Sequence, residues 1–380
     1  MKISLLLQRF DPLGGGLERY VAHWAGWLSG RGHEVHIVAG TGENARTGVT
    51  LHAIGGLPDD PLDQAHRLVA HAAALRPNIV QDFGDGLGSD VFQPLGGARA
   101  AARAGELAAL DPLRRMKRHL SPRWRGRRRA TSNLERWQVR GVGTTIVACS
   151  QRVSDDLVRL SGAEPSRIRI IYNAVDCQRL RPVAPAARLS ARSSLGLPAS
   201  GTLFVQVAHN FRLKGVASSL KAIARLAGEG VDCALAVAGE GPNLEAYRKL
   251  ADVLGAAGSV HFLGPVDDTR TLYAAADALV HPAFYDACSL ACLEALACGL
   301  PVAVSRADGA SGLLTHGVQG WVIDNPANPA EIAFRMKQLL DPGLREAMGA
   351  QARVLAEHND RADAFQRLEA LCEAIAGAKN

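Results

Sequence analysis

The chain has 380 residues, 47% of them hydrophobic and 21% charged, and a formal net charge of +6, a composition typical of a globular protein rather than a disordered or fibrous one. A single compact core rarely reaches this size, so the length predicts two domains. No apolar run approaches the roughly 20 residues that span a bilayer, and the first residues, MKISLLLQRFDP, lack the cleavage site of a secretory signal.

The seven cysteines are an odd number scattered along the chain, which favours reduced thiols and a cytoplasmic protein over a disulfide framework. Cys288, Cys292 and Cys298 lie close in sequence, but their spacing matches no zinc pattern and their neighbours are apolar. We therefore expect buried thiols there and no metal.

In the first half of the chain, strand-like apolar runs alternate with helix-length amphipathic segments. The strand-like runs are ISLLL (3–7), EVHIVAG (34–40), NIVQDF (78–83) and TTIVAC (144–149). This alternation predicts βα units around a parallel sheet. The pattern continues through RIRIIYNAVD (167–176) and breaks in RPVAPAARLSARSSLGLPASG (181–201), whose proline, alanine and serine content predicts an interdomain linker.

The same alternation restarts after this segment. Its runs are TLFVQVAHN (202–210), CALAVAGEGP (233–242), SVHFLG (259–264), ADALVHP (276–282) and PVAVS (301–305), with a helix expected from about Gly215 and a helical C-terminal end. The fold class predicted is therefore α/β, with two Rossmann-like doubly wound domains, 1–178 and 179–380, that face a central cleft. Ligands of such sheets bind beyond the carboxyl ends of the strands.

Two loops at such strand ends are suited to phosphate. Gly14, Gly15 and Gly16 precede a helix after the first strand, and glycines allow an anion to approach free N–H groups at a helix N-terminus. The spacing is not the dinucleotide fingerprint GxGxxG, and a flexible turn is the alternative reading. In the second domain, Arg212 and Lys214 follow the first strand, where two cations could neutralise a diphosphate without a metal.

A third loop carries two carboxylates, Asp286 and Glu294, in HPAFYDACSLACLEALACGLPVAVS (281–305). Both can reach one ligand if a helix begins near Ser289 with its free N–H groups directed at the same place. The alternative is that Glu294 has only a structural role beside that helix.

These segments resemble, in order and over nearly the whole chain, the retaining GT-B glycosyltransferases that include the lipopolysaccharide core glucosyltransferases and many mannosyltransferases. The similar segments are RIRIIYNAVD, AVAGEGP, VHFLGPVDD and DACSLACLEALACGLPVAVS. The resemblance implies an N-terminal acceptor-binding domain, a C-terminal nucleotide-sugar-binding domain, and no divalent metal or other cofactor.

The resemblance also implies roles for single residues. Glu294 would contact the donor ribose, and Asp286 with the backbone around Ser289 and Leu290 would hold the transferred sugar. The diphosphate would be bound by Arg212 and Lys214 and approached by the Gly15 and Gly16 backbone, and Val266 falls where the family contacts the nucleobase.

The chain departs from the family at two places: Asp286 stands where glutamate is usual, and His209 replaces a common arginine. A histidine that many members carry in the first domain is missing from NIVQDFGDGLGSDVFQPLGG (78–97). Asp90 in this stretch resembles the aspartate of the lipopolysaccharide core branch and is our candidate catalytic group beside the acceptor. Asp82 and Asp85 are rivals, and a structural role for all three is an equal alternative.

One segment makes the protein basic: residues 113–140 contain ten arginines and one lysine against a single acid, Glu135. The residues that we expect to contact an anionic membrane or acceptor are Arg123, Trp124, Arg125, Arg127, Arg128 and Arg129. A merely solvated face and nucleic acid are the alternatives, and we expect no nucleic acid because the resemblance places this segment in the acceptor domain.

The sequence thus predicts a retaining, metal-independent hexosyltransferase on the inner face of the cell membrane, acting in the cell envelope on a lipid-linked or cell-surface glycan such as lipopolysaccharide core. Front-face attack and a covalent intermediate are both compatible with retention. The alternatives are a nucleotide-sugar epimerase of the same fold and a non-catalytic glycan- or nucleic-acid-binding protein.

Overall fold

The computed structural model describes residues 1–12, 14–43, 48–266 and 268–379. The chain divides into two compact units. The first consists of Met1–Ala104, Pro112–Tyr172 and Ala362–Asn380, and the second consists of Gly105–Asp111 and Asn173–Arg361.

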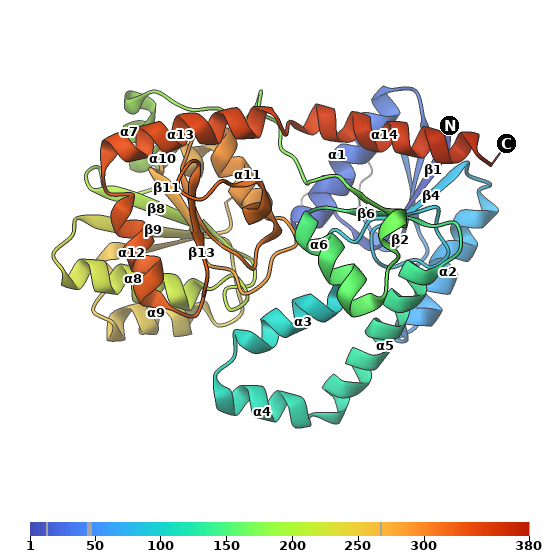
Figure 1. Ribbon diagram of the computed structural model, residues 1–380, viewed down its shortest axis with the longest axis horizontal. Helices are drawn as coiled ribbons and strands as arrows, with labels where there is room; N and C mark the ends of the chain where they lie inside the picture. The colour runs from blue at the N-terminus through green and yellow to red at the C-terminus, as the bar shows by residue number, and fades with distance from the viewer. Residues whose placement is uncertain (13, 44–47, 267, 380) are drawn as a thin grey trace. The chain divides into compact units, whose positions relative to one another are not determined.

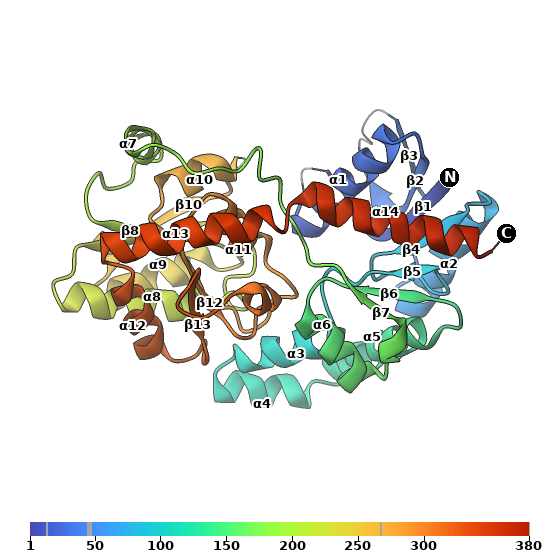
Figure 2. The same ribbon diagram turned by 45° about the horizontal axis from the view of Figure 1, so that its top comes forward.

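Seven parallel strands within the described residues form the sheet of the first unit (Figure 1), in the order β3-β2-β1-β4-β5-β6-β7, which can be followed by the labels in Figure 2. They are β1 (Lys2–Phe10), β2 (Glu34–Gly42), β3 (Val49–Ala53), β4 (Ile79–Asp82), β5 (Val91–Phe92), β6 (Thr145–Ala148) and β7 (Ile168–Ile170). Leu5, Leu6 and Leu7 of β1 are all buried, as expected for a parallel strand that is covered on both faces.

The helices in this half of the chain follow the predicted βα alternation only in part, because β2 leads directly to β3, β4 leads directly to β5, and three helices separate β5 from β6. They are α1 (Gly16–Gly30), α2 (Pro61–Ala74), α3 (Arg99–Ala108), α4 (Pro112–Leu120), α5 (Pro122–Arg140) and α6 (Gln151–Asp156). The basic segment is divided at Pro122: α4 ends at Leu120, and Ser121 caps α5 by accepting the N–H of Trp124. Proline at the first helical position leaves no donor unpaired.

The last helix, α14 (Arg361–Gly377), lies beside α1 (Figure 2), whereas the predicted boundaries put the C-terminal residues in the second domain. Phe365 packs edge-on against Tyr20, Trp24 and Trp27 of α1. The buried Glu369 carboxylate accepts the Trp27 Nε1–H at 3.0 Å. This aromatic packing and the satisfied buried carboxylate hold α14 on the first unit.

Six parallel strands among the described residues form the second sheet, in the order β10-β9-β8-β11-β12-β13. They are β8 (Thr202–Val207), β9 (Cys233–Ala238), β10 (Val260–Gly264), β11 (Ala278–His281), β12 (Val302–Ser305) and β13 (Gly320–Ile323). The helices are α7 (Pro185–Ser194), α8 (Val216–Gly228), α9 (Leu244–Val253), α10 (Thr269–Ala275), α11 (Leu290–Ala297), α12 (Pro329–Gln338) and α13 (Pro342–Glu357). The prediction of two Rossmann-like domains is confirmed.

The predicted linker at 181–201 is wrong. Its central part is the helix α7, and the chain passes from one unit to the other at Tyr172 and Asn173. The Arg192 side chain of α7 is buried and donates to Asp277 at 2.5 Å and to the Ala275 carbonyl at 3.0 Å. A proline at the start of the helix and a buried arginine with several hydrogen-bond acceptors explain why this segment, whose composition is typical of a linker, is part of a domain.

Both strand orders reverse direction around the first strand of their unit, between β1 and β4 and between β8 and β11. Such switch points are where open parallel sheets bind ligands, beyond the carboxyl ends of the strands. Among the described residues, no helix combines the length and the apolar character needed to cross a membrane.

Candidate functional site

The loop between β8 and α8 carries Lys214, and two of its backbone carbonyls accept hydrogen bonds that hold it in place. The Leu213 carbonyl accepts the N–H of Phe284 at 2.8 Å, and the Gln206 side chain donates to the Lys214 carbonyl at 2.7 Å. Gly215 caps α8 with a φ of +71°, and a Cβ there would lie 2.0 Å from the Pro282 carbonyl oxygen. Only glycine permits this approach, which brings the loops after β8 and β11 together.

Lys214 forms an ion pair with Asp286, whose side chain is 16% exposed. Asp286 Oδ2 is also 3.2 Å from His281 Nε2. Burial alone raises the pKa of Asp286, but the Lys214 charge and the His281 hydrogen bond outweigh it and hold the pKa well below its usual range. The structure thus unites two residues predicted from different loops, and Asp286 is ionised.

A second carboxylate, Asp308, lies behind this pair and was missed by the sequence analysis. It is fully buried, its Oδ2 lies 3.6 Å from His281 Nε2, and its Oδ1 accepts the N–H groups of Ser289 at 3.1 Å and Ala310 at 2.8 Å. Burial, and then the negative charge of Asp286, raise the pKa of Asp308 to about 6. Asp308 follows β12 and His281 ends β11, so their positions at strand ends were the signal that could have identified them.

Cys292 completes a buried cluster with His281 and Asp308, whose potential ligand atoms lie within 4.8 Å of one another. The Cys292 thiol donates to Asp308 Oδ2 at 3.5 Å, and burial and the Asp308 charge raise its pKa. The hydrogen bond of Cys292 to Asp308 and the contact of Asp308 with His281 make these side chains one polar network. Cys288 and Cys298 are buried and form no disulfide, as predicted.

The helix α11 begins where the sequence predicted. Ser289 is its N-cap and accepts the Cys292 N–H at 3.3 Å, and Leu290 is the first helical residue. The first-turn N–H groups of a helix attract oxygen atoms of an anion or a hydroxyl. Because Ser289 is held by Asp308, the direction of this helix end is fixed by the buried network.

Glu294 lies in the second turn of α11 and is half-buried. Its Oε2 accepts the hydroxyl proton of Tyr273 of α10 at 2.8 Å. Burial, followed by the Glu294 charge, raises the pKa of Tyr273, so the phenol stays protonated and orients the carboxylate. A fixed, partly exposed carboxylate is suited to a pair of hydroxyls.

Two further predicted donor residues lie at strand ends. Arg212 is half-buried, and its Nε is enclosed without a hydrogen-bond partner in the part of the chain that the structure describes. The predicted contact of Arg212 with a diphosphate stays a prediction. Val266 follows β10 and is half-buried, and its predicted contact with a nucleobase stays a prediction.

In the first unit, α1 begins at Gly16, and its N-cap is Gly15, which has no side chain to accept an N–H of the first turn. Glu18 in the first turn folds back: its Oε2 would lie 3.1 Å from a Cβ on Gly15. This helix end therefore already has a carboxylate beside it, which competes with the predicted approach to a diphosphate.

The structure counts against Asp90 as the catalytic group beside the acceptor. Asp90 precedes β5 at the amino end of the sheet, where its carboxylate accepts the Val80 N–H at 2.8 Å and pairs with Lys379 at 2.6 Å. The buried Asp82 accepts three backbone N–H groups of the following turn and is structural. Asp85 lies beyond the carboxyl end of β4, which makes it the better placed of the three rivals.

The basic segment forms α4 and α5 (Figure 1). Arg123, Arg125, Arg128 and Arg129 are exposed, Trp124 is half-buried, and the Arg127 side chain lies outside the described residues. The apolar side chains of α4 are also exposed: Leu113 by 69%, Met116 by 55% and Leu120 by 64%. Their spacing of three and four residues puts them on one face of the helix.

Two family models match the two halves of the chain: Glycosyltransferase Family 4 over residues 14–179 and Glycosyl transferases group 1 over residues 188–355. A D-inositol 3-phosphate glycosyltransferase of Acidothermus cellulolyticus is 29% identical over 94% of this chain and 87% of its own length. One of the same name from Corynebacterium jeikeium is 33% identical over 54% of this chain, a match that spans about half of its own length.

Solved structures are similar over the full chain. WaaG, a glycosyltransferase involved in lipopolysaccharide biosynthesis, superposes with a TM-score of 0.81 and 25% identity over 99% of this chain and 100% of its own. Anabaena Alr3699/HepE in complex with UDP-glucose has a TM-score of 0.72 and 20% identity over 98% of this chain and 100% of its own. The second of these likenesses bears on the fold alone.

Proposed function

We propose that this glycosyltransferase of the GT-B fold moves a hexose from a UDP-sugar to a hydroxyl of a lipid-linked or cell-surface glycan, with retention at the anomeric carbon. The observation that carries the proposal is the cluster of Lys214, Asp286 and the capped start of α11 at the switch point of the second sheet. It combines a cation, a carboxylate and free helix N–H groups in one place, which are the groups that a sugar diphosphate requires.

In this proposal the second unit holds the donor. Lys214 and Arg212 neutralise the diphosphate as its charge grows on departure, which is the largest charge change of the reaction and requires no metal. Asp286 accepts a hydroxyl of the transferred sugar, and Glu294 accepts those of the ribose. Front-face attack and a covalent intermediate are both compatible with these positions.

A second candidate acceptor is a small phosphorylated polyol. It is favoured by the relatives named D-inositol 3-phosphate glycosyltransferase, just as the glycan is favoured by the likeness to WaaG. Both acceptors use the same donor chemistry, so the two candidates differ only in what the first unit binds.

We further propose that α4 and α5 dock the protein on an anionic membrane surface at the inner face of the cell membrane. Exposed arginines surround the apolar face of α4 formed by Leu113, Met116 and Leu120. Apolar side chains that enter the interface and cations that meet lipid phosphates are the two features of such a surface. Nucleic acid would use the cations but not the apolar face.

The test is release of nucleoside diphosphate from a panel of nucleotide sugars, with and without lipid and oligosaccharide acceptors and with and without a chelator. We expect release from a UDP-sugar, stimulation by an acceptor, an α-linked product from an α-linked donor, and no effect of the chelator. An epimerase would change the sugar without releasing the diphosphate, and a binding protein would bind the nucleotide without turnover. Either result would overturn the proposal.

A further inference from the structure

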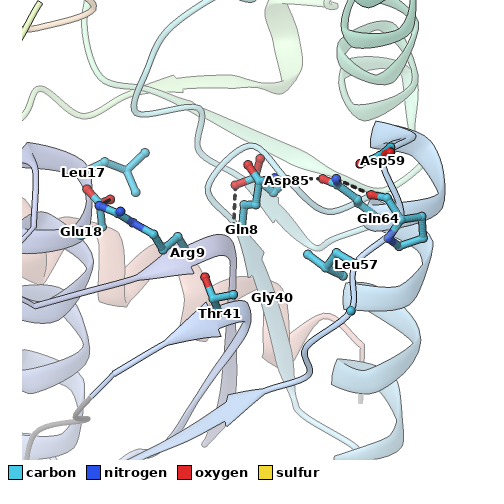
Figure 3. Close-up of a pocket in the computed structure, with 12 residues that line it drawn as sticks. Gln8, Arg9, Leu17, Glu18, Gly40, Thr41, Leu57, Asp59, Gln64 and Asp85 are labelled. Atoms are coloured by element: carbon cyan, nitrogen blue, oxygen red, sulfur yellow. Dashed lines mark hydrogen bonds and ion pairs between the residues drawn. The ribbon is translucent and has the colours of Figure 1, made fainter. Parts of the chain in front are cut away.

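A pocket of about 750 Å³ opens in the first unit at the carboxyl ends of β1 and β2 (Figure 3). Gln8 and Arg9 of β1 and Thr41 of β2 form one part of its lining, and Asp85, which follows β4, forms another. All of these residues lie in the first unit, beside the reversal of strand order between β1 and β4. Its size and position are those of a small-molecule site.

The charge of the pocket is negative. Three carboxylates line it, those of Glu18, Asp59 and Asp85, against one guanidinium, that of Arg9. Arg9 is not a free cation, because it pairs with Glu18 at 3.4 Å (Figure 3). The first turn of α1 would otherwise attract an anion, but the Glu18 carboxylate already lies beside it. Arg99, which is outside the lining, lies 3.7 Å from Asp85. Three carboxylates against two guanidinium groups leave an excess of negative charge, which would repel a phosphate that entered.

The polar groups are arranged for hydroxyls. Asp85 Oδ2 accepts the Gln8 N–H at 2.9 Å, and the side chains of Gln8 and Gln64 bond to each other at 3.2 Å. Gln64 is held in turn by the Pro58 carbonyl at 2.5 Å. These contacts fix the carboxylate and the two amides while leaving further lone pairs and N–H groups for a ligand, and such groups recognise vicinal hydroxyls or an ammonium group.

One wall of the pocket is apolar and closely packed. Leu57 reaches over β2 at Gly40, where a Cβ would lie 2.2 Å from Leu57 Cδ1. A larger residue at position 40 would therefore push Leu57 into the pocket. An apolar wall opposite fixed polar groups is suited to a ring that has a C–H face and a hydroxylated edge.

We propose that this pocket binds the acceptor as a non-phosphorylated polyhydroxyl ring, either neutral or bearing an amine. The inference rests on the proposed function, because it takes the first unit to hold the acceptor. It separates the two candidate acceptors: the lining favours the terminal sugar of a glycan over a phosphorylated inositol. Asp85, Asp59 and Gln64 are the residues that would determine this specificity.

The test is ligand-observed saturation-transfer NMR on the full chain with UDP present, using glucosamine and two matched pairs. The pairs are glucose with glucose 6-phosphate and myo-inositol with D-inositol 3-phosphate. We expect transfer to the non-phosphorylated member of each pair and to glucosamine, and binding of the phosphorylated member to be weaker by about tenfold or more, because like charges repel it. Tighter binding of a phosphorylated member, or no transfer to any of the five probes, would overturn the inference.

Variants of two lining residues and of one control residue test whether the probes bind in this pocket. Asp85→Asn and Asp59→Asn should each weaken glucosamine binding and reduce the difference in affinity between the two members of each pair. Asp63→Asn is the control and should change neither quantity, because Asp63 is an exposed carboxylate of α2 that does not line the pocket. Equal binding by all three variants would also contradict the inference. UDP affinity, measured by calorimetry on the same samples, tests the proposed function separately. If the wild-type protein does not bind UDP, the donor site is contradicted and the pocket is not.

Discussion

At the switch point of the second sheet, the ionic groups form one continuous network, whereas the ionic groups of the pocket in the first unit are held separately, Glu18 by Arg9 and Asp85 by the Gln8 N–H. The network consists of Lys214 and Asp286, which are partly exposed, and His281 and Asp308, which are buried. The pocket instead contains Asp59, which is exposed, and Asp85, which is anchored by a backbone N–H and lies 3.7 Å from Arg99.

The difference corresponds to what each site must do. In the proposed function the second unit binds a diphosphate and a ribose that are the same in every reaction cycle, so a rigid network suits them, and a low-dielectric site strengthens each charge interaction. In the pocket of the first unit, the exposed Asp59 and the backbone-anchored Asp85 can be exchanged without disturbing such a network. Substitutions should therefore have larger and less local effects in the second unit than in the first.

The largest effect is expected for Lys214→Ala. The change removes the cation that meets the departing diphosphate and leaves the Asp286 charge without its main partner, so we expect kcat to fall by about 10²–10³-fold, with a smaller change in KM. Lys221→Ala, which removes an exposed lysine of α8, is the matched control and should leave both constants unchanged. A kcat equal to that of the wild type would remove Lys214 from the mechanism.

Replacement of Arg127, Arg128 and Arg129 by Gln tests the membrane proposal and leaves both sites intact. Each arginine close to an anionic surface contributes about 1 kcal/mol, so binding to anionic vesicles should weaken by about 3 kcal/mol while UDP affinity stays the same. Wild-type binding should fall as salt rises, and neutral vesicles should not bind. The control replaces the exposed Arg76, Arg159 and Arg169, which removes the same charge. Equal loss in both variants, or preference for duplex DNA, would contradict docking by α5.

Glu294→Gln should weaken UDP binding by roughly 1–3 kcal/mol, because a charge-assisted hydrogen bond to the ribose is lost. Isothermal calorimetry measures the change directly, and a melting curve checks that α11 is still folded. An affinity that does not change in the folded variant would show that Glu294 is structural.

Asp308→Asn tests whether the ionised carboxylate of Asp308 lowers the stability of the folded protein. The pKa of Asp308 is raised to about 6, so between about pH 4 and pH 6 the folded protein keeps a proton that the unfolded chain has lost. Folding stability from this group is therefore greatest at low pH and falls as pH rises through this window. Asparagine does not titrate, so the variant does not lose stability in this way. The unfolding free energy of the variant minus that of the wild type should therefore increase by roughly 1–3 kcal/mol from pH 4 to pH 7. Parallel pH profiles would contradict this assignment.

The residues predicted for the second unit depend on local patterns. Strand ends, the glycine before α8 and the N-cap at Ser289 are short-range signals, and the structure brings Lys214 and Asp286 of these loops together, while their roles stay predictions. The partnership of Asp308 with His281 depends on β12 lying next to β11, which no local pattern reports. Asp90 was misplaced for a related reason: DGLGSD contains two aspartates, and only the strand register decides which of them follows a carboxyl end. The pocket of the first unit unites β1, β2, α2 and the turn after β4, and was not predicted at all.

The smallest effect is expected for Tyr273→Phe, and it decides how Glu294 acts. The ring is fully buried, so phenylalanine keeps the packing and removes only the hydroxyl that donates to Glu294 at 2.8 Å. If Tyr273 only orients the carboxylate, UDP binding should weaken by about 0.5–1.5 kcal/mol, less than in Glu294→Gln. The double variant should then bind UDP no more weakly than Glu294→Gln alone, because an orienting residue has nothing left to orient. Additive losses would mean that Tyr273 contributes to binding independently of Glu294.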